Sequence, residues 1–238
     1  MRKLYKWLIG ILITLLVIIL GSFIVIKNKE YQPSTAANNA AETSTMINST
    51  TKFQGDDTKP MVIFYPGALV EPKSYSIWAK QVATAGYSVY IVRFPLDMAV
   101  LKTNAASKIQ DDKDYVIGGH SLGGTMASRY AHNNQKHLKG VFFLASYPEE
   151  KGTLRKTDVH VLSITASHDG VLNQNNYQKA KKLLPSNTVY ELISGGNHAG
   201  FGSYGKQSGD NIATISNQKQ QNIISKLLIN WLNYNISE

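Results

Sequence analysis

The sequence predicts an α/β fold with a doubly wound, mostly parallel sheet, preceded by one N-terminal transmembrane helix. Short runs rich in β-branched and aromatic residues recur from Pro60 onward, and segments with a helical pattern alternate with them. A long uncharged apolar stretch near the N-terminus predicts the membrane helix. We therefore expect one folded domain over residues 60–238 behind a membrane anchor.

Most of the predicted strands are apolar on both faces, as is typical of central parallel strands that helices cover. The strands are 61–65, 87–92, 114–119, 140–145, 159–164 and 188–193. The helical patterns are 74–85, 97–109, 122–134, 173–184 and 217–234. Ligands bind such sheets at the carboxyl ends of the strands, so the residues that follow each strand are the first candidates for a functional site.

Composition excludes several classes of protein. The chain has 238 residues, a formal net charge of +9 and no cysteine. Disulfide bonds, thiolate zinc sites and a cysteine nucleophile are therefore excluded. Five basic residues and one acidic residue lie within residues 1–30, and the remaining positive excess is spread thinly. No arginine-rich stripe alternates with aromatic residues, so we expect no nucleic-acid partner.

Residues 7–26 carry no charged side chain and predict an uncleaved transmembrane anchor. At ~1.5 Å per residue, a helix of this length crosses the ~30 Å hydrocarbon core of a bilayer. A cleaved signal peptide is the alternative, but its apolar region usually spans only ~7–15 residues. Basic residues flank both ends, and we expect the short stub at 1–6 to stay in the cytoplasm. The protein is then a single-pass protein of the cell membrane with its domain outside the cell.

Residues 27–59 are a predicted flexible linker. From Tyr31 onward this stretch is rich in serine, threonine, asparagine and alanine, and it has almost no large apolar residues. Such a segment buries too little apolar surface to offset the entropy lost on ordering. We therefore expect the linker to let the folded domain stand away from the bilayer.

The first candidate catalytic residue is Ser121, in the sequence Gly-His-Ser-Leu-Gly at 119–123. It follows a predicted strand and precedes a helical pattern, which is typical of a nucleophile on a tight strand-to-helix turn. Such a turn has unfavourable backbone angles, and its glycine neighbours relieve the crowding. The helix N-terminus that follows would stabilise developing negative charge. An ordinary glycine-rich turn with a capping serine is the alternative.

A serine nucleophile needs a base with a pKa near neutrality and a carboxylate that orients the base. Asp169 follows strand 159–164 and His198 follows strand 188–193, which gives the chain order Ser, Asp, His expected for such a sheet. His168 is the main alternative base, but its neighbour in sequence is the acid, which leaves little room to bridge that acid to the serine. The alternatives to the acid lie at the start of a strand or within one: Asp158 and Glu191.

The remaining histidines are weaker candidates for the base. His120 is adjacent to the serine in sequence, but it should point away from the site if Ser121 points into it. The others should be solvated or part of the structure: His132, His137 and His160.

The tetrahedral intermediate of acyl transfer needs two preset N–H donors around its oxygen. We expect one from Leu122, directly after the serine, and the other from Ala68, in the Pro-Gly-Ala-Leu turn that follows strand 61–65. Leu69 is the alternative to Ala68. A simple Pro-Gly turn would explain the same residues.

Little sequence separates strand 140–145 from strand 159–164, so we expect an open site with a minimal lid. Four side chains on loops at the carboxyl edge of the sheet could line a substrate pocket: Glu71, Asp97, Phe201 and Tyr204. Phe201 and Tyr204 could instead pack against the loop that carries His198, and Asp97 could serve at a helix N-terminus.

The chain from about Lys59 to its C-terminus resembles the compact bacterial α/β hydrolases, the fold-5 group akin to dienelactone hydrolases. The stretches that carry the resemblance are YPGALVEPKSY, FPLDMAVL, GGHSLGGTMA, SHDGV and GGNHAGFGSYG. The resemblance implies an α/β-hydrolase fold, a Ser121–Asp169–His198 triad and no cofactor, and we expect no metal site. Dienelactone hydrolases proper use cysteine as the nucleophile, and this chain has serine there.

The leading hypothesis is a membrane-anchored serine hydrolase that cleaves carboxylic esters or related acyl bonds of a small-molecule or lipid-like substrate. A peptidase, amidase or thioesterase with the same triad is the alternative among enzymes. A non-catalytic envelope binding module and a membrane-anchored structural protein are the alternatives from other classes.

Overall fold

The computed structural model describes residues 27–236, together with residues 5, 7, 11, 12, 14, 15 and 21. The chain divides into two compact units, Met1–Glu30 and Tyr31–Glu238. The predicted stub at 1–6 and anchor at 7–26 lie largely outside the described residues. Among the residues that are described, no helix is both long enough and apolar enough to cross a bilayer.

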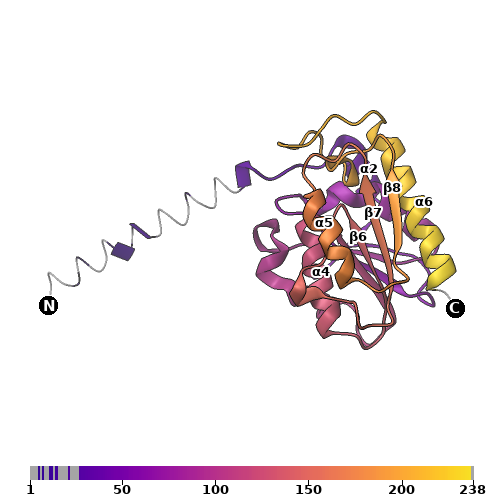
Figure 1. Ribbon diagram of the computed structural model, residues 1–238. Helices are drawn as coiled ribbons and strands as arrows, with labels where there is room; N and C mark the ends of the chain where they lie inside the picture. The colour runs from indigo at the N-terminus through magenta and orange to yellow at the C-terminus, as the bar shows by residue number, and fades with distance from the viewer. Residues whose placement is uncertain are drawn as a thin grey trace. The chain divides into compact units, whose positions relative to one another are not determined.

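The second unit is built on an eight-stranded sheet with the order β1-β2-β4-β3-β5-β6-β7-β8 (Figure 1). Six strands are parallel: β3 (Met61–Tyr65), β4 (Val89–Val92), β5 (Tyr115–His120), β6 (Leu138–Leu144), β7 (His160–Ala166) and β8 (Val189–Ile193). These are the six strands that the sequence predicted, with ends that differ by at most two residues. A short antiparallel hairpin, β1 (Thr45–Ile47) and β2 (Thr50–Phe53), extends the sheet beside β4.

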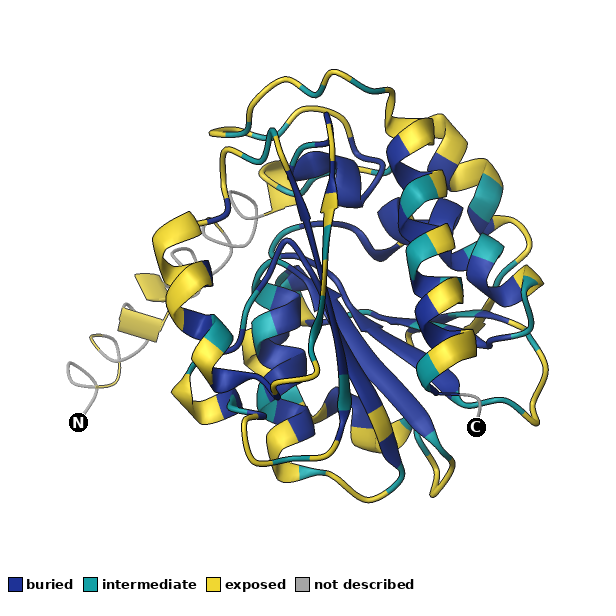
Figure 2. Cartoon of the chain, turned by 45° about the vertical axis from the view of Figure 1, so that its right-hand side comes forward, coloured by how far each residue is buried: buried dark blue, intermediate teal, exposed yellow. Residues whose placement is uncertain are grey.

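Helices cover both faces of the sheet and create two hydrophobic cores (Figure 2). Successive side chains of a strand point to opposite faces, so Val62 and Phe64 of β3 enter one core while Ile63 and Tyr65 enter the other. The first core packs against α3 (Ser76–Thr84) and α6 (Asn217–Asn235), and the second against α4 (Leu122–Asn133). This two-sided burial explains why the strands lack the polar alternation of a half-exposed sheet.

Two of the predicted helices differ from the observed ones. The predicted helix 97–109 consists of 3-10 turns, η2 (Pro95–Asp97) and η3 (Ala99–Lys108). Leu96 and Asp97 have φ values of 53° and 50°, in the left-handed region, so the chain does not enter a regular α-helix there. The predicted helix 173–184 is an α-helix only over α5 (Gln174–Ala180), followed by the 3-10 turn η5 (Lys181–Leu183).

The prediction of a flexible linker at 27–59 is wrong for most of that range. Residues 35–41 form a helix, α2 (Thr35–Ala41), whose Ala37 and Ala41 are buried, and α2 packs against α3. β2 follows, pairs with β4 and buries Phe53 in the first core. Small alanine side chains allow close helix packing while contributing little to hydrophobicity, so the composition of the segment concealed its order.

Residues 31–34, which we call the strap, connect two loops at the carboxyl edge of the sheet. Tyr31 donates its N–H to the Leu69 carbonyl at 2.7 Å and accepts from the Glu71 N–H at 3.1 Å. Ser34 donates its N–H to the Ser203 carbonyl at 2.7 Å, and the two serine hydroxyls lie 2.7 Å apart. The strap therefore holds the turn after β3 and the loop after β8 from the same short segment.

Candidate active site

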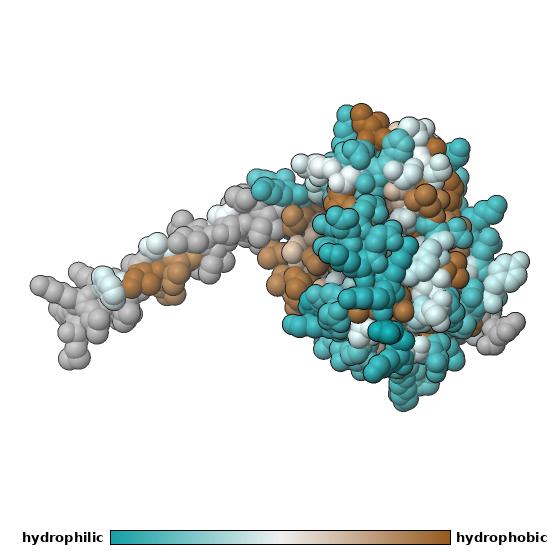
Figure 3. All heavy atoms as spheres, in the orientation of Figure 1, coloured by the Kyte–Doolittle hydropathy of each residue, from teal (hydrophilic) through white to brown (hydrophobic). Residues whose placement is uncertain are grey.

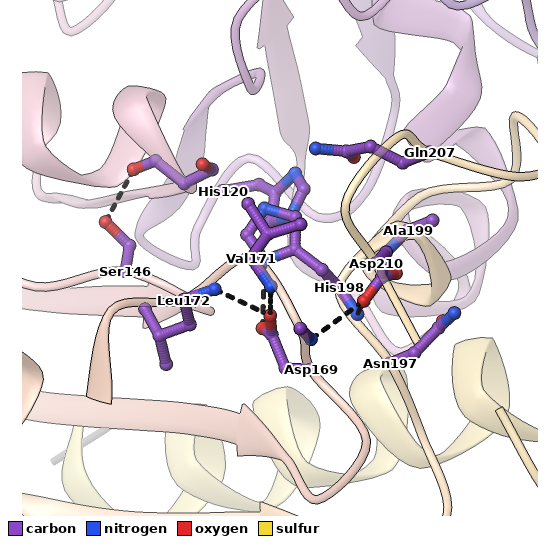
Figure 4. Close-up of polar contacts among 12 residues, drawn as sticks. His120, Ser146, Asp169, Val171, Leu172, Asn197, His198, Ala199, Gln207 and Asp210 are labelled. Atoms are coloured by element: carbon purple, nitrogen blue, oxygen red, sulfur yellow. Dashed lines mark hydrogen bonds and ion pairs between the residues drawn. The ribbon is translucent and has the colours of Figure 1, made fainter. Parts of the chain in front are cut away.

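Ser121 occupies a strained turn between β5 and α4. Its φ of 52° and ψ of −126° lie outside the regions that non-glycine residues favour. A Cβ on Gly119 would come within 2.5 Å of the Gly123 backbone, and one on Gly123 would collide with the Tyr65 carbonyl. The hydroxyl of Ser146 donates to the Ser121 carbonyl at 2.6 Å (Figure 4). Both glycines are thus required for the turn that the sequence predicted.

The structure brings together Asp169 and His198, which follow β7 and β8 respectively. Oδ2 of Asp169 lies 2.8 Å from Nδ1 of His198, and both side chains are almost completely buried. Oδ1 of Asp169 accepts the N–H groups of Val171 at 2.9 Å and Leu172 at 2.8 Å (Figure 4). A carboxylate only accepts hydrogen bonds, so Nδ1 of His198 is the donor, and Nε2 of the neutral ring carries the lone pair.

Ser121 and His198 line one open cavity of about 340 Å³. Nε2 of His198 is buried and has no hydrogen-bond partner among the described residues. Nε2, the ring nitrogen that could accept a proton, therefore has no hydrogen bond to a described residue, whereas Nδ1 donates to Asp169. In unliganded sites of this type, the bond from serine to histidine often forms only when substrate binds.

The same cavity has one apolar and one polar group of lining residues. The apolar residues are Leu122, Ala145, Val171 and Leu172. The polar residues are Thr125, Ser146, Tyr147, Glu149 and Asn173. Glu149 forms an ion pair with Arg129, which balances its charge.

The turn after β3 leaves one N–H group without a protein partner. Gly67 donates its N–H to the Tyr75 hydroxyl at 2.9 Å, and Leu69 donates its N–H to the Asp97 carbonyl at 2.9 Å. Between them, the Ala68 N–H has no hydrogen bond to any described residue. The N–H of Leu69, the alternative donor, already has a hydrogen-bond acceptor in the Asp97 carbonyl. Leu122 is the first residue of α4, where backbone N–H groups lack an intrahelical acceptor.

None of the four predicted pocket residues lines the cavity of Ser121. Glu71 forms an ion pair with Arg93 and accepts the Lys73 N–H at 2.7 Å. Asp97 is buried in the loop after β4, where its carbonyl accepts the Leu69 N–H. The structure therefore does not bring these two acids into the cavity: the Glu71 carboxylate pairs with Arg93, and the Asp97 backbone holds the turn after β3.

Phe201 and Tyr204 are also absent from the cavity wall, and the structure places both in the packing of the His198 loop, the other role predicted for them. Phe201 is fully buried and stacks on His120, with ring centroids 5.7 Å apart. Tyr204 contacts the ring of Tyr31 at 5.3 Å, and its hydroxyl donates to Gln207 at 2.9 Å. Both side chains fix the loop that carries His198.

His120 has a structural role that the sequence did not reveal. Its Nδ1 lies 2.9 Å from the Tyr75 hydroxyl, and its ring centroid is 4.5 Å from that of His198. Burial, and then the nearby His198 ring, lower the pKa of His120 well below its ordinary value of 6.5, so His120 is neutral. The Tyr75 hydroxyl also accepts the Gly67 N–H, so it contacts both Gly67 and His120. This chain connects the turn after β3 to the end of β5.

Two buried glutamines of α6 support the His198 loop. Gln220 accepts the Asn197 N–H at 3.1 Å and donates to the Asn197 carbonyl at 2.8 Å. Gln221 donates to the carbonyls of Gly200 at 2.7 Å and Gly202 at 3.0 Å. Sequence reasoning missed both, since polar residues at the start of an amphipathic helix usually face solvent.

A mostly parallel sheet with helices on both faces, a serine on a strained strand-to-helix turn and an aspartate–histidine pair after two later strands define the class of α/β hydrolases. Residues 61–222 match the alpha/beta hydrolase family, and the chain belongs to that family. The predicted resemblance to this superfamily is confirmed. No curated protein sequence matches the chain.

Solved structures share the fold at low sequence identity. The α/β hydrolase MGS-MChE2, from the metagenome of sediments of the Mar Chica lagoon, is 16% identical with a TM-score of 0.60, over 80% of this chain and 97% of that one. A dienelactone hydrolase from Anabaena variabilis is 12% identical with a TM-score of 0.59, over 81% and 95%. The esterase domain of a Rhodothermus marinus protein is 12% identical with a TM-score of 0.56, over 79% and 95%.

Proposed function

We propose that the protein is a serine hydrolase that cleaves carboxylic esters or related acyl bonds. The arrangement of His198 carries the proposal. Its Nδ1 lies 2.8 Å from Oδ2 of Asp169, and its Nε2 has no hydrogen bond to a described residue. The same side chain lines the cavity together with Ser121. This is the relation between base, acid and nucleophile that acyl transfer requires.

In the proposed reaction, Oγ of Ser121 attacks the carbonyl carbon of the ester and Nε2 of His198 takes the hydroxyl proton. Asp169 keeps the imidazole in the required tautomer and stabilises the imidazolium that forms. The N–H groups of Ala68 and Leu122 donate to the oxyanion. The imidazolium then protonates the leaving alkoxide, which departs as an alcohol and leaves an acyl-enzyme. Water, deprotonated by His198, releases the acid and regenerates Ser121.

The electrostatics of the site support this cycle. The only titratable ring in contact with His198 among the described ring contacts is His120, and it is neutral because burial lowers its pKa. A positive charge on His198 therefore meets no like charge from that neighbour. Developing negative charge on the substrate lies at the N-terminus of α4, where the helix dipole is favourable.

The cavity favours a small acyl group. Its volume of about 340 Å³ lies at the lower end for ligand pockets, and four apolar side chains form part of its wall. We expect p-nitrophenyl acetate and butyrate to be hydrolysed faster than p-nitrophenyl palmitate at equal concentrations. Initial rates with the three esters test this. A clear preference for palmitate would contradict the small-acyl assignment.

We also propose that residues 7–26 anchor the protein in the cell membrane, with the domain on the outer side. The support is the run of 20 residues without a charge and the basic residues on both flanks. Substrates would then be small or lipid-like acyl compounds of the cell envelope.

The proposed activity is tested by ester hydrolysis in paired serine variants. We expect Ser121→Ala to lower kcat for p-nitrophenyl acetate by about 10⁴-fold or more, because the nucleophile is lost. Ser107→Ala is the matched control, since Ser107 is exposed and bonds only its own 3-10 turn. Equal activity of Ser121→Ala and Ser107→Ala would overturn the proposal.

A further inference from the structure

We propose that Asp210 is a positioning residue of the site: its carboxylate locks the loop that bears Asp169 to the loop that bears His198. The inference rests on the proposed function, because it assigns a role in keeping that acid and that base aligned. Asp210 itself does not line the cavity of Ser121 and would act only through the two loops.

The contacts of Asp210 are unusual in number and in origin. Oδ1 accepts the N–H groups of Gly170 at 3.0 Å, His198 at 3.2 Å and Asn211 at 2.9 Å. Oδ2 accepts the N–H of Ala199 at 2.8 Å, and Figure 4 labels Asp210 together with Ala199 and His198. Gly170 directly follows Asp169 in the sequence. One side chain therefore binds the backbone next to the acid and the backbone of the base.

The segment around Asp210 packs so closely against Gly170 that a side chain at position 170 would not fit. A Cβ on Gly170 would come within 2.7 Å of the Gly209 carbonyl and 2.9 Å of the Asn211 nitrogen. The absence of a side chain at Gly170 is what lets the segment around Asp210 approach the acid loop. The approach is therefore a specific feature of the fold.

A carboxylate suits this position better than any neutral side chain. It presents two oxygens that only accept, and all four of its partners are N–H donors. Hydrogen bonds to a charged acceptor are roughly twice as strong as neutral ones. An asparagine has one oxygen, so at least one of the N–H groups would face an NH₂ donor.

Other hydrogen bonds also hold these loops. Next to Asp210, Nδ1 of His168 lies 3.1 Å from the Ile212 carbonyl, and the Asn197 amide donates to the Asn211 carbonyl at 2.7 Å. Two more bonds lie near the strand ends. His168 donates its N–H to the Gly196 carbonyl at 2.8 Å, and Gly195 donates its N–H to the Ser167 hydroxyl at 2.8 Å. These bonds continue the pairing of β7 with β8. Beyond them, Asp210 provides the connection at Gly170 and His198, next to the reacting groups. A relative shift of the two loops would disturb the 2.8 Å bond between Asp169 and His198. This matters for activity, because a misplacement of about 1 Å costs about 100-fold in rate.

The test compares Asp210→Asn and Asp210→Ala with wild type and with Asp112→Asn, which removes an exposed aspartate paired only with Lys136. Kinetics with p-nitrophenyl acetate should show kcat lowered about 10- to 100-fold in Asp210→Ala and less in Asp210→Asn. KM should stay within about twofold, since no cavity-lining side chain changes. Asp112→Asn should match wild type. Circular dichroism at the assay temperature confirms that each variant is folded.

A proton NMR signal reports the alignment without any turnover. The imidazole N–H that His198 donates to Asp169 should give a far-downfield resonance in wild type that is lost in Asp169→Asn. We expect it to be weakened or shifted in both Asp210 variants. A folded Asp210→Ala or Asp210→Asn variant with wild-type kcat and an unchanged resonance would overturn the inference. If wild type itself fails to hydrolyse the ester, the proposed function falls, and the NMR comparison still decides the role of Asp210.

Discussion

At the residue scale, the site contains two neighbouring imidazoles with different hydrogen-bond partners, their ring planes tilted by 44°. His198 donates to the carboxylate of Asp169, whereas His120 meets the hydroxyl of Tyr75. Burial, and then the neighbouring His198 ring, hold the pKa of His120 well below its ordinary value, so His120 stays neutral. The chain order Ser, Asp, His and the positions of the strand ends were sufficient to predict that Asp169 and His198 lie together. The roles of His120, Tyr75 and Asp210 depend on contacts between distant segments that no local pattern encodes.

The pH dependence of stability follows from His120. Its pKa in the folded state lies well below 6.5, while in the unfolded chain it is close to that value. The unfolded state therefore binds more protons below about pH 6.5, and the contribution of His120 to stability is lost as the pH falls through that range. We expect the free energy of unfolding in urea to decline from pH 7 to pH 5. His120→Gln should flatten this decline. An equal decline in the variant would contradict the assignment of His120 as a buried neutral ring.

Tyr75 should contribute to both stability and rate. Tyr75→Phe leaves the buried Gly67 N–H and the His120 Nδ1 without their partner, and such losses cost ~1–3 kcal/mol each. We expect a lower free energy of unfolding and, because the turn of Ala68 is released, a lower kcat. Urea unfolding and ester kinetics measure the two effects. Tyr5→Phe is the control because Tyr5 is exposed. A Tyr75→Phe variant as stable as wild type would refute the proposed hydroxyl chain.

At the element scale, strands were predictable and the segment before them was not. Runs such as 61–65 are β-branched, aromatic and buried on both faces, so composition and structure agree. Residues 27–59 have the composition of a linker, yet α2 and β2 order because α3 and β4 offer them complementary surfaces. The segment 97–109 has a helical pattern in sequence but forms no α-helix: Asp97 at its start has a left-handed φ, and the backbone of Lys102 and Asn104 leaves the helical region.

The strap should be needed for activity. A chain that begins at residue 31 retains the hydrogen bonds to Leu69 and Ser203, whereas one that begins at residue 45 loses them together with α2. We expect the first chain to keep wild-type kcat with p-nitrophenyl acetate. The second should lose stability and activity, because the Ala68 turn and the His198 loop each lose their hydrogen bonds to the strap. Full activity of the shorter chain would show that the strap does not position these loops.

At the scale of the whole molecule, the domain has the surface of a protein that meets water. Hydrophilic side chains cover most of its visible face in Figure 3, and apolar side chains form small patches. The proposed membrane attachment rests on residues 7–26.

Removal of the N-terminal segment should change the location of the protein and leave its chemistry intact. We expect the full chain to sediment with membranes and resist extraction by high salt, because an apolar span is held by the hydrophobic effect and salt screens only charge. The chain that begins at residue 31 should remain in the soluble fraction. Release of the full chain by salt alone would contradict an apolar anchor.

The central claim is that Ser121 is the nucleophile that His198 activates. The most direct test is to treat the full-length protein with a fluorophosphonate and map the adduct by mass spectrometry. We predict one adduct, on the peptide that contains Ser121, and its loss in both Ser121→Ala and His198→Ala. An adduct on another serine, or labelling that persists in Ser121→Ala, would contradict the claim.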